Sequence, residues 1–317
     1  MTSLAMTLQT PMPPDPGGAP PAVRGTKGRF GAPLGAWYPV ARDSRLRQGL
    51  LVQLHGRDLL LQRDAEGAVT APDRPDLLIL SSAGLVWARQ HNDDGAASAV
   101  PPVMEDEVGG ARFPMIACSE IELAADYDQA VLGLVDPAHV PMVHDAWWWR
   151  SSPRRRVKTK HYSPSPFGFT ATAADSFTSA PAYALAGSKP RVTIEFRLPS
   201  TRIERVESGG FRLVNLTTVT PSGPGRVILR NVIYCTVRPM RWLYPALSAL
   251  GRAFLEQDGR ILRRLESHAS VTQPLLFVGA PDQPSLWYFQ CKAALARAAQ
   301  GAAFVNPVRP TVLQWRT

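Results

Sequence analysis

Two histidines and a nearby carboxylate stand in the segment Asp136-Pro-Ala-His139-Val-Pro-Met-Val-His144, and these residue types can bind a metal ion. On a regular α-helix, a separation of five residues would place the two imidazoles about 140° apart, too far round the axis to share one ion. Pro141 lies between them and must break or bend a helix, so convergence is feasible. Taken alone, such a pair is more often structural than metal-binding.

A further carboxylate, Asp258, stands on the apolar face of a predicted helix. The apolar stripe of that helix consists of Leu247, Leu250, Phe254, Ile261 and Leu265. A carboxylate on a buried face is costly unless it is paired or coordinates a metal, whereas Glu256 is expected to face solvent. Two interpretations stay open. Asp258 is a buried acid satisfied by arginine or backbone donors, or it joins the two histidines in the facial triad of Fe(II) oxygenases, which leaves positions for dioxygen and substrate.

The elements that must position these residues follow from hydrophobic periodicity. Short alternating runs separated by turns predict a small β-region over residues 37–87. Helical spacing predicts a helix over about 124–144, and alternation predicts antiparallel strands over about 158–237. Two helices are predicted to close the chain, over about 246–267 and 285–299. The second region is therefore expected to run helix, antiparallel sheet, helix, helix.

Composition limits the classes of protein that fit. With 317 residues, 45% of them hydrophobic, the chain can build a sizeable core, in two modest domains or in one large domain with an appendage. No run approaches the roughly 18 uncharged apolar residues of a membrane span, so no membrane association is expected. Residues 1–33 carry no secretory pattern and are predicted to be a flexible tail, and residues 92–110 a linker. Three scattered cysteines, Cys118, Cys235 and Cys291, form no CxxC pair, which fits a cytoplasmic location.

The net charge of +9 is carried largely by arginine, including the run Arg154, Arg155, Arg156. Basic motifs interleaved with aromatic residues are absent, so no nucleic-acid partner is expected. A solvated arginine-rich surface and a docking face for an acidic redox partner both fit this charge.

The spacing Asp136-X2-His139-X4-His144 resembles the mononuclear iron motif of the Rieske-type non-heme iron oxygenases, in their ring-hydroxylating α-subunits. The longer phrase from Leu134 to His144 is similar to the branch that includes demethylases and pheophorbide-type oxygenases. Phe254-Leu-Glu-Gln-Asp258 resembles the late Phe-X-Glu-X-Asp element of that family.

Three shorter phrases extend the resemblance towards the N-terminus. Trp37-Tyr-Pro-Val40, Gly56-Arg-Asp-Leu59 and Gly84-Leu-Val-Trp87 are similar to the first and last strands of the family's Rieske domain. The resemblance thus runs from Trp37 to the C-terminus, with the motifs in the family's order.

This resemblance implies an α+β fold in two domains. A truncated Rieske-like β-domain would occupy residues 34–91, and a helix-grip (START-like) catalytic domain, with an antiparallel sheet and long helices, residues 111–317. It also implies a mononuclear Fe(II) ion bound by His139, His144 and Asp258.

The resemblance assigns roles to further residues. It implies that Asp136 hydrogen-bonds a ligand histidine and bridges towards the cluster of a neighbouring subunit. Trp148, Phe169, Phe196 and Trp287 are predicted to line a substrate pocket, with ordinary core packing as the alternative role for each.

The sequence departs from the family at the iron-sulfur cluster. That cluster needs Cys-X-His followed later by Cys-X2-His, and none of the three cysteines has this context. Asp73-Arg74 resembles the residues before the first ligand, but Pro75-Asp76 follows, and the segment from Leu77 is already typical of the domain's exit strands. The chain is therefore expected to lack the ligand segment and to hold no [2Fe-2S] cluster.

The resulting hypothesis is an oxygenase that hydroxylates or demethylates a small apolar substrate, such as an aromatic one, with O2. Its electrons would come from a Rieske centre on another protein, either a reductase, a ferredoxin or a partner oxygenase subunit, within a trimer or hetero-oligomer. The alternative is a non-catalytic helix-grip subunit that binds a ligand or regulates a hetero-oligomeric oxygenase. Retention of all three presumptive ligands favours the enzyme, and iron chemistry without an external Rieske centre stays open as a third reading.

Overall fold

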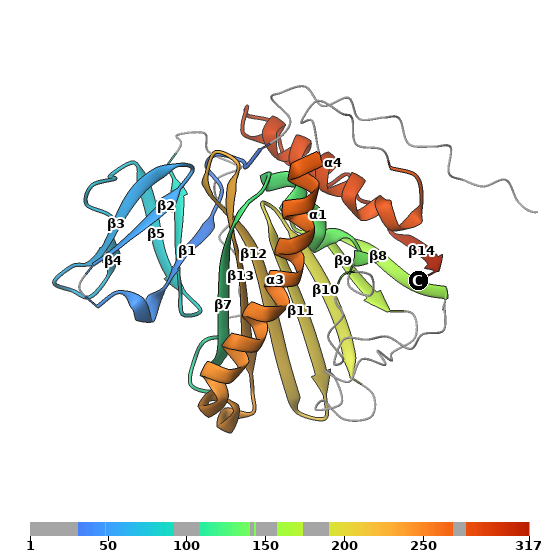
Figure 1. Cartoon of the computed structure of the whole chain (residues 1–317). Helices are drawn as coiled ribbons and strands as arrows, with labels where there is room; N and C mark the ends of the chain where they lie inside the picture. The colour runs from blue at the N-terminus through green and yellow to red at the C-terminus, as the bar shows by residue number, and fades with distance from the viewer. Residues whose placement is uncertain are drawn as a thin grey trace, which may run out of the picture.

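The structure is a computed structural model that describes residues 31–47, 49–91, 108–139, 143, 157–173, 190–268 and 277–316, without the side chains of 265–268 and 316. His144 and Trp148 lie outside the described residues, as do the arginine run 154–156 and most of the predicted tail and linker. Figure 1 shows a small β-region on one side of a large sheet, which carries helices across one face.

The small β-region contains two three-stranded antiparallel sheets. Their strands are β1 (Tyr38–Arg42), β6 (Leu85–Gln90) and β5 (Leu77–Ser82) in one sheet, and β2 (Leu50–Leu54), β3 (Arg57–Arg63) and β4 (Val69–Thr70) in the other. A short 3-10 helix, η1 (Asp43–Arg45), follows β1. Alternation of apolar residues buries Tyr38, Leu59, Leu61, Leu85 and Trp87 completely. These strands agree with the predicted β-region.

The large sheet is antiparallel throughout and has the order β14-β8-β9-β10-β11-β12-β13-β7. Its strands are β7 (Met115–Ala124), β8 (Val157–Ser165), β9 (Gly168–Ala173), β10 (Arg191–Arg197), β11 (Thr201–Ser208), β12 (Phe211–Gly223), β13 (Arg226–Cys235) and β14 (Thr311–Arg316). One face buries Ile203, Leu216 and Val232 in a cluster with Trp87 and Phe113. The opposite face, called the interior face below, packs against the helices.

Among the described residues, three α-helices lie on the interior face: α1 (Tyr127–Val135), α3 (Tyr244–His268) and α4 (Gln283–Ala298). Short 3-10 helices, η4 (Arg238–Leu243) and η5 (Ala280–Asp282), precede α3 and α4. Helix α3 runs along β7, α1 covers β12 and β13, and α4 reaches β9 (Figure 1). Glycine lets α3 approach closely, because a Cβ at Gly251 would lie 2.4 Å from the Ser119 hydroxyl.

The mixed α and β class with a large antiparallel sheet is confirmed, but several expected elements were wrong. Of the helix predicted over 124–144, α1 covers Tyr127–Val135, with Asp126 as its cap, and the backbone is helical again at His139 and Val143. Asp136 is extended because the residue before a proline avoids the α-helical conformation. Strands β7 and β14 were not predicted, so the second region begins and ends with a strand.

The apolar stripe predicted for α3 was also partly wrong. Leu250 is 41% exposed, whereas Leu255 and Leu262 carry the buried contacts. The buried side of the helix is therefore rotated relative to the predicted stripe, and the Asp258 side chain sits beside it, 18% exposed.

Polar contacts join the small β-region to the large sheet. The Arg230 guanidinium, 2% exposed, donates to the backbone carbonyl of Pro39 and pairs with Glu120 at 3.0 Å. The backbone N–H of His55, in the turn between β2 and β3, donates to the carbonyl of Pro221 at 2.9 Å. In the described part of the chain, no helix is long and apolar enough to cross a membrane.

Candidate metal centre

The structure brings His139 and Asp258 together. The His139 imidazole Nε2 lies 2.7 Å from the Asp258 carboxylate Oδ1, although 119 residues separate them in the chain. His139 follows the end of α1, and Asp258 lies in the middle of α3. Their side chains are 14% and 18% exposed, so the pair is largely shielded from water. Two of the four predicted centre residues therefore meet between α1 and α3.

Asp136 fixes the turn that carries His139. Its carboxylate accepts the backbone N–H of Ala138 at 2.8 Å, and its own N–H donates to Leu132 at the end of α1. The turn therefore has a defined conformation immediately before the imidazole. Its role in a relay between subunits stays a prediction.

The donor set fits an iron ion. Imidazole and carboxylate are the ligand types of the facial triad, and two ligands bound at right angles at about 2.1 Å lie about 3 Å apart. The observed 2.7 Å separation is close to that value. Within the described residues there is no group of three histidine, cysteine or acidic side chains, and the predicted third ligand, His144, lies outside them.

The three described aromatic residues of the predicted substrate pocket contact one another. Phe169 on β9 has its ring centre 5.5 Å from that of Phe196 on β10 and 5.6 Å from that of Trp287 on α4. All three are at most 5% exposed, which is the burial of core residues. Their packing links α4 to the interior face, and their part in substrate binding remains a prediction.

A polar cluster on the interior face was missed by sequence reasoning. Tyr162 on β8 pairs with Ala171, Ala171 with Ile194, and Ile194 with Glu204 on β11. Directly paired residues of an antiparallel sheet share a face, so this row crosses four strands on one side. Lys160 and Arg202 occupy the same face, two residues before Tyr162 and Glu204 respectively.

Charged groups in this cluster act on one another across the strands. Burial, followed by the nearby Arg202 guanidinium, lowers the pKa of Lys160 to about 8, while Glu204 opposes the shift. Arg202 pairs with Glu204 at 2.8 Å. Burial, followed by Asp136, raises the pKa of the Tyr162 hydroxyl, so the cluster also lies near the turn that carries His139.

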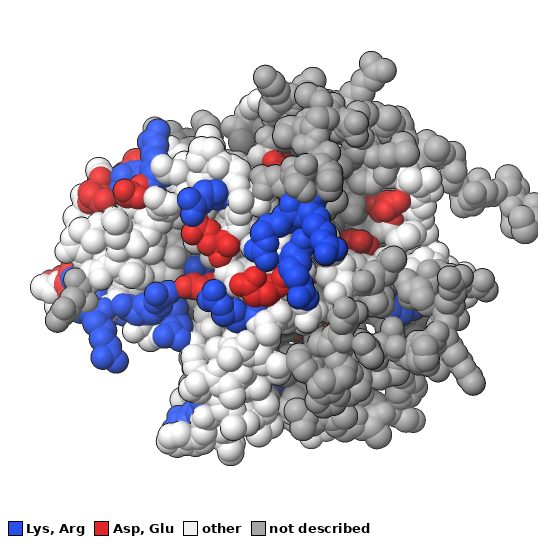
Figure 2. Space-filling view, viewed as in Figure 1, with Lys and Arg blue, Asp and Glu red and all other residues white. Residues whose placement is uncertain are grey.

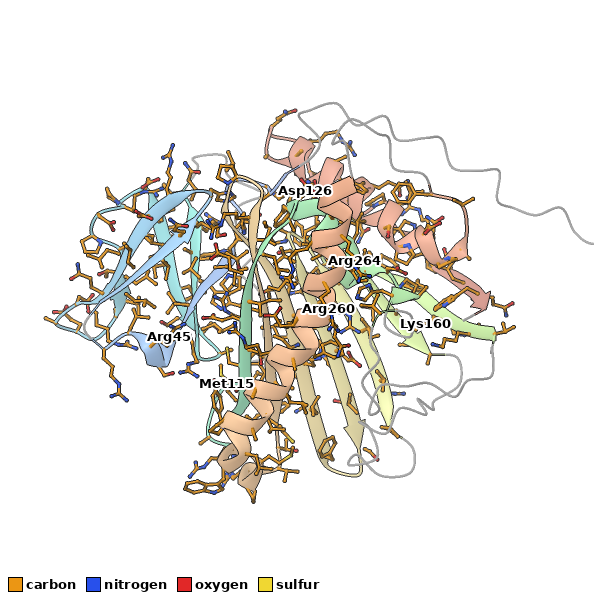
Figure 3. The ribbon with its side chains drawn as sticks, viewed as in Figure 1. Arg45, Met115, Asp126, Lys160, Arg260 and Arg264 are labelled. Carbon is orange, nitrogen blue, oxygen red and sulfur yellow. The ribbon has the colours of Figure 1, made fainter. Side chains whose placement is uncertain are left out.

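A sequence signal for this cluster exists. Lys158, Lys160 and Tyr162 alternate along β8, as do Arg202 and Glu204 along β11. Alternation places each set on one face of its own strand, but it does not tell which face is interior. Figure 3 labels Lys160 on β8, apart from Arg260 and Arg264 on α3.

The outer surface of α3 is basic. Lys and Arg side chains gather over α3 in Figure 2, with acidic side chains beside them. Arg252 and Arg263 share Glu256 at 3.9 and 3.4 Å, and all three are exposed, as predicted for Glu256. Helix α3 therefore presents Asp258 inward and a positively charged surface outward.

The three cysteines all lie in the large-sheet region. Cys118 is on β7, Cys235 ends β13 and Cys291 is on α4, and each is a free thiol. In the small β-region, the six residues 71–76 connect β4 to β5, and Asp73 there accepts the backbone N–H of Leu60.

No protein family and no curated protein matches the sequence. The fold, however, is similar to solved structures of oxygenases. NdmA of Pseudomonas putida CBB5 with caffeine superposes with a TM-score of 0.62 at 14% identity, covering 87% of this chain and 96% of NdmA. Dicamba monooxygenase bound to 3,6-dichlorosalicylic acid gives 0.62 at 13% identity, with coverages of 84% and 97%. NdmB of the same Pseudomonas strain gives 0.57 at 13% identity, with coverages of 88% and 94%.

These likenesses define the class of fold. The chain has the fold of these NdmA and dicamba monooxygenase structures along most of its length. A dicamba monooxygenase structure with the same fold contains non-heme iron and dicamba, at a TM-score of 0.54 and 13% identity. At such identities the likeness extends to the fold alone.

Proposed function

We propose that this chain is the mononuclear Fe(II) component of an oxygenase, an oxidoreductase that uses O2 to hydroxylate or demethylate a small, largely apolar substrate. His139, His144 and Asp258 would bind the iron. The non-catalytic subunit is the alternative, and the iron experiment below separates the two.

The contact between His139 and Asp258 carries this proposal. An imidazole and a carboxylate from distant segments lie 2.7 Å apart in a shielded position, at about the separation of two ligands on one ion. Bound there, iron would supply the activation of dioxygen. A solely structural pair is the competing explanation, and only iron binding separates the two.

The residues of this chain would hold and orient the centre. Asp136 would keep the turn before His139 in place through its bond to the Ala138 N–H. Leu255 and Leu262, buried on either side of Asp258, would hold α3 against the sheet and exclude water from the carboxylate. Residues that contact the ligands without binding the metal contribute to metal sites in this way, by fixing the orientation of the ligands.

We propose further that electrons come from a Rieske centre on another protein. Residues 34–91 contain no cysteine, and only six residues join β4 to β5, at the position where the sequence resemblance places the cluster ligands. A [2Fe-2S] cluster of this type needs two thiolates. A reductase, a ferredoxin or a partner oxygenase subunit would therefore dock on the chain, and the basic outer surface of α3 suits an acidic donor.

The test begins with the purified full-length chain, reconstituted anaerobically with Fe(II) and separated from free metal. We expect about one iron per chain by metal analysis, as a single facial triad requires. The visible spectrum of a Rieske cluster should be absent. Failure to retain iron stoichiometrically would falsify the oxygenase proposal and favour the non-catalytic subunit.

A second measurement tests the source of electrons. Oxygen consumption by the iron-loaded chain is measured with candidate substrates, first with a chemical reductant alone and then with a Rieske-containing reductase or oxygenase added. Substrate-dependent oxygen uptake is expected only in the second case. Equal uptake without any Rieske protein would contradict electron supply in trans while leaving the iron proposal intact.

A further inference from the structure

The segment that leads into α3 exposes a group of large apolar side chains. Val237, Trp242, Leu243 and Leu250 are 40, 76, 54 and 41% exposed, and Trp242 is the most exposed large apolar side chain of the described residues. They belong to residues 237–250, which comprise η4 and the start of α3 and lie at the lower end of the molecule in Figure 1. The exposed side chains of residues 237–250 are called the η4 patch below. Tryptophan is highly buried on average, and exposed apolar groups of this kind mark interaction sites.

The charges of the η4 patch are all positive. Arg238 and Arg241 are exposed, and neither forms an ion pair with a described residue. Residues 237–255 contain no aspartate or glutamate, so the first turn of α3 has no carboxylate to balance the partial positive charge of the helix N-terminus. The patch therefore favours an anionic partner.

The carboxylates that flank the η4 patch are already paired with arginines. Glu207 on β11 lies 3.4 Å from Arg212, whose carbonyl accepts the N–H of Thr236 beside the start of the patch. Glu256, the first acidic residue along α3, lies 3.9 Å from Arg252. In Figure 2 this end of the molecule is largely white, with blue at its edge. The positive charge of the patch is thus left for a partner outside the described residues.

The apolar and the basic side chains of the η4 patch are in contact. The Arg241 guanidinium carbon lies 5.1 Å from the centre of the Trp242 ring, the geometry of a cation–π contact. Tryptophan is enriched at the level of lipid headgroups, because its ring is apolar and its N–H is polar. Arginine is attracted to anionic lipids. Tryptophan and leucine next to arginine are typical of segments that lie in a membrane interface.

We propose that the η4 patch binds the surface of a membrane that contains anionic lipids. Trp242 and Leu243 would insert among the headgroups, and Arg238 and Arg241 would bind the lipid phosphates. This inference goes beyond the proposed function and does not depend on iron. Asp258 lies 14 residues after the first residue of α3, about 21 Å along the helix, so the candidate metal centre is well away from the bound surface.

A membrane surface fits the η4 patch better than a second protein does. A stable protein interface takes about 800 Å² from each partner, contributed by about 20 to 30 residues, and it has a polar rim. The η4 patch is one segment of 14 residues at one end of the molecule, and its charges have a single sign. An anionic bilayer offers a broad surface of opposite charge, with an apolar interior that the exposed side chains can enter.

Binding of this kind needs no spanning segment. The sequence predicted no membrane association because no run of residues is long and apolar enough to cross a bilayer. A peripheral contact depends instead on a few exposed apolar side chains and on attraction to anionic lipids, which the η4 patch supplies. The proposal therefore replaces that expectation with peripheral association.

The experiment measures co-sedimentation of the full-length chain with sucrose-loaded vesicles. Vesicles of phosphatidylcholine alone are compared with vesicles of an equimolar mixture of phosphatidylcholine and phosphatidylglycerol. We expect the chain to bind the mixed vesicles at least about tenfold more tightly, since each basic residue near an anionic surface contributes about fivefold. Salt at about 1 M, where the Debye length is about 3 Å, should largely remove this preference.

Two variants test the charged and the apolar parts of the η4 patch separately. The double variant Arg238→Gln/Arg241→Gln should bind the mixed vesicles about 30-fold more weakly, at about fivefold for each arginine. Trp242→Ser keeps every charge and should weaken binding about tenfold, because it removes a large apolar side chain from the bilayer interface. Trp242→Phe should retain most of the binding.

Matched controls change exposed residues outside the η4 patch. Leu51→Ser removes an apolar side chain that is 63% exposed on β2, and Arg57→Gln/Arg309→Gln removes two exposed arginines. Both controls should bind the mixed vesicles as the wild type does. No vesicle binding, equal binding to the two kinds of vesicle, or an equal loss in the controls would overturn the proposal.

The occupant of the η4 patch is checked on the same preparations. Molar mass is measured by light scattering, with and without the Trp242→Ser change. A mass that falls in this variant, together with no vesicle binding by the wild type, would overturn the proposal in favour of a contact between copies of the chain. Vesicle binding is expected to be the same with and without bound iron, so that this proposal and the oxygenase proposal fail separately. Should Trp242→Ser fail to fold, the double arginine variant, the salt dependence and the controls decide.

Discussion

The small β-region and the large sheet are both antiparallel and both have dense cores, but their polar residues serve different ends. In the small β-region, the turn that contains His55 and the carbonyls of Pro39 and Val40 meet the large sheet through hydrogen bonds. In the large-sheet region, His139, Asp258 and Lys160 are directed at one another or at the interior face. The polar contacts of the small β-region thus attach it to the large sheet, whereas those of the large-sheet region bring together residues of the candidate site.

This difference agrees with the proposal that the small β-region is a β-scaffold without the ligands of a cofactor. The small β-region keeps fully buried Tyr38, Leu59 and Trp87, and burial of such side chains stabilises a fold whether or not a cluster is bound. Function resides in sites carried by a fold rather than in the fold itself. The likeness to oxygenase structures therefore supports the fold of both regions. Whether either region binds a metal ion or a substrate has to be tested separately.

The largest effect is expected from Asp258→Asn, which tests whether the interior of the large-sheet region holds the chemistry. Removal of a charged ligand should lower the affinity for Fe(II) by at least about 100-fold, more than the 10- to 100-fold typical of residues that only orient a ligand. The affinity is measured by anaerobic titration with a competing chelator. Glu256→Gln, two residues away on the exposed side of α3, is the control and should bind iron as the wild type does. Equal affinities for both variants would contradict the assignment.

The next largest effect is expected where the two regions join. Arg230→Met removes a buried guanidinium that donates to Pro39 and pairs with Glu120, so it should lower the free energy of unfolding by about 3–5 kcal/mol. Urea denaturation measures this change. The control is Arg226→Met on the same strand, whose exposed pair with Glu122 should contribute less than about 1 kcal/mol. Similar losses in both variants would show that the junction is no more than a surface contact.

Much of the fold could be predicted from the sequence, because each predicted element had its own local signal. Alternation identified β2 and β10, a short apolar run identified β3, and helical spacing placed α3 and α4 within two residues of their observed starts. The likeness in fold to the oxygenase structures agrees with the resemblance carried by the motifs.

The missed elements depend on contacts that local sequence does not encode. Strand β14 pairs with β8, which lies about half the chain earlier, and β7 is held by β13 and by the close approach of α3 at Gly251. The end of α1 was misplaced because the helical pattern continues past Asp136, while Pro137 stops the backbone.

The residues of the candidate site also differ in whether local sequence or only tertiary structure reveals them. His139 and Asp258 could be proposed from their residue types and motifs. Their contact depends on the tertiary structure and could not be predicted from local sequence. Lys160 and Arg202 were missed because strand periodicity does not say which face of a strand is interior, nor how β8 and β11 are ordered in the sheet. His144 and Trp148 lie outside the described residues, so their predicted roles stay predictions.

A smaller effect, dependent on pH, tests whether the partly buried His55 of the small β-region is structural. Burial lowers the pKa of His55 to about 4, so below about pH 6.5 the unfolded chain takes up a proton that the folded chain refuses until about pH 4. The free energy of unfolding should therefore fall by at most about 3 kcal/mol as the pH drops through this window.

His55→Asn should remove this part of the acid sensitivity, since asparagine tolerates the positive φ of 52° at this turn. Unfolding is measured by urea denaturation at a series of pH values, and the difference between wild type and variant is followed. A difference that does not change between pH 6.5 and pH 4 would show that the imidazole is not held neutral by the junction.

The smallest effect is expected from Thr220→Val, which refines the picture of the junction. The Thr220 hydroxyl is fully buried and donates to the Pro39 carbonyl at 2.8 Å, so its loss should cost about 1 kcal/mol of unfolding free energy. The cost is lower than for Arg230→Met because Pro39 keeps the guanidinium as a donor. Thr311 donates to the Arg309 carbonyl at the same distance but is exposed, so Thr311→Val should change stability by less than about 0.5 kcal/mol. Equal changes in the two threonine variants would mean that burial at the junction adds nothing to the hydrogen bond.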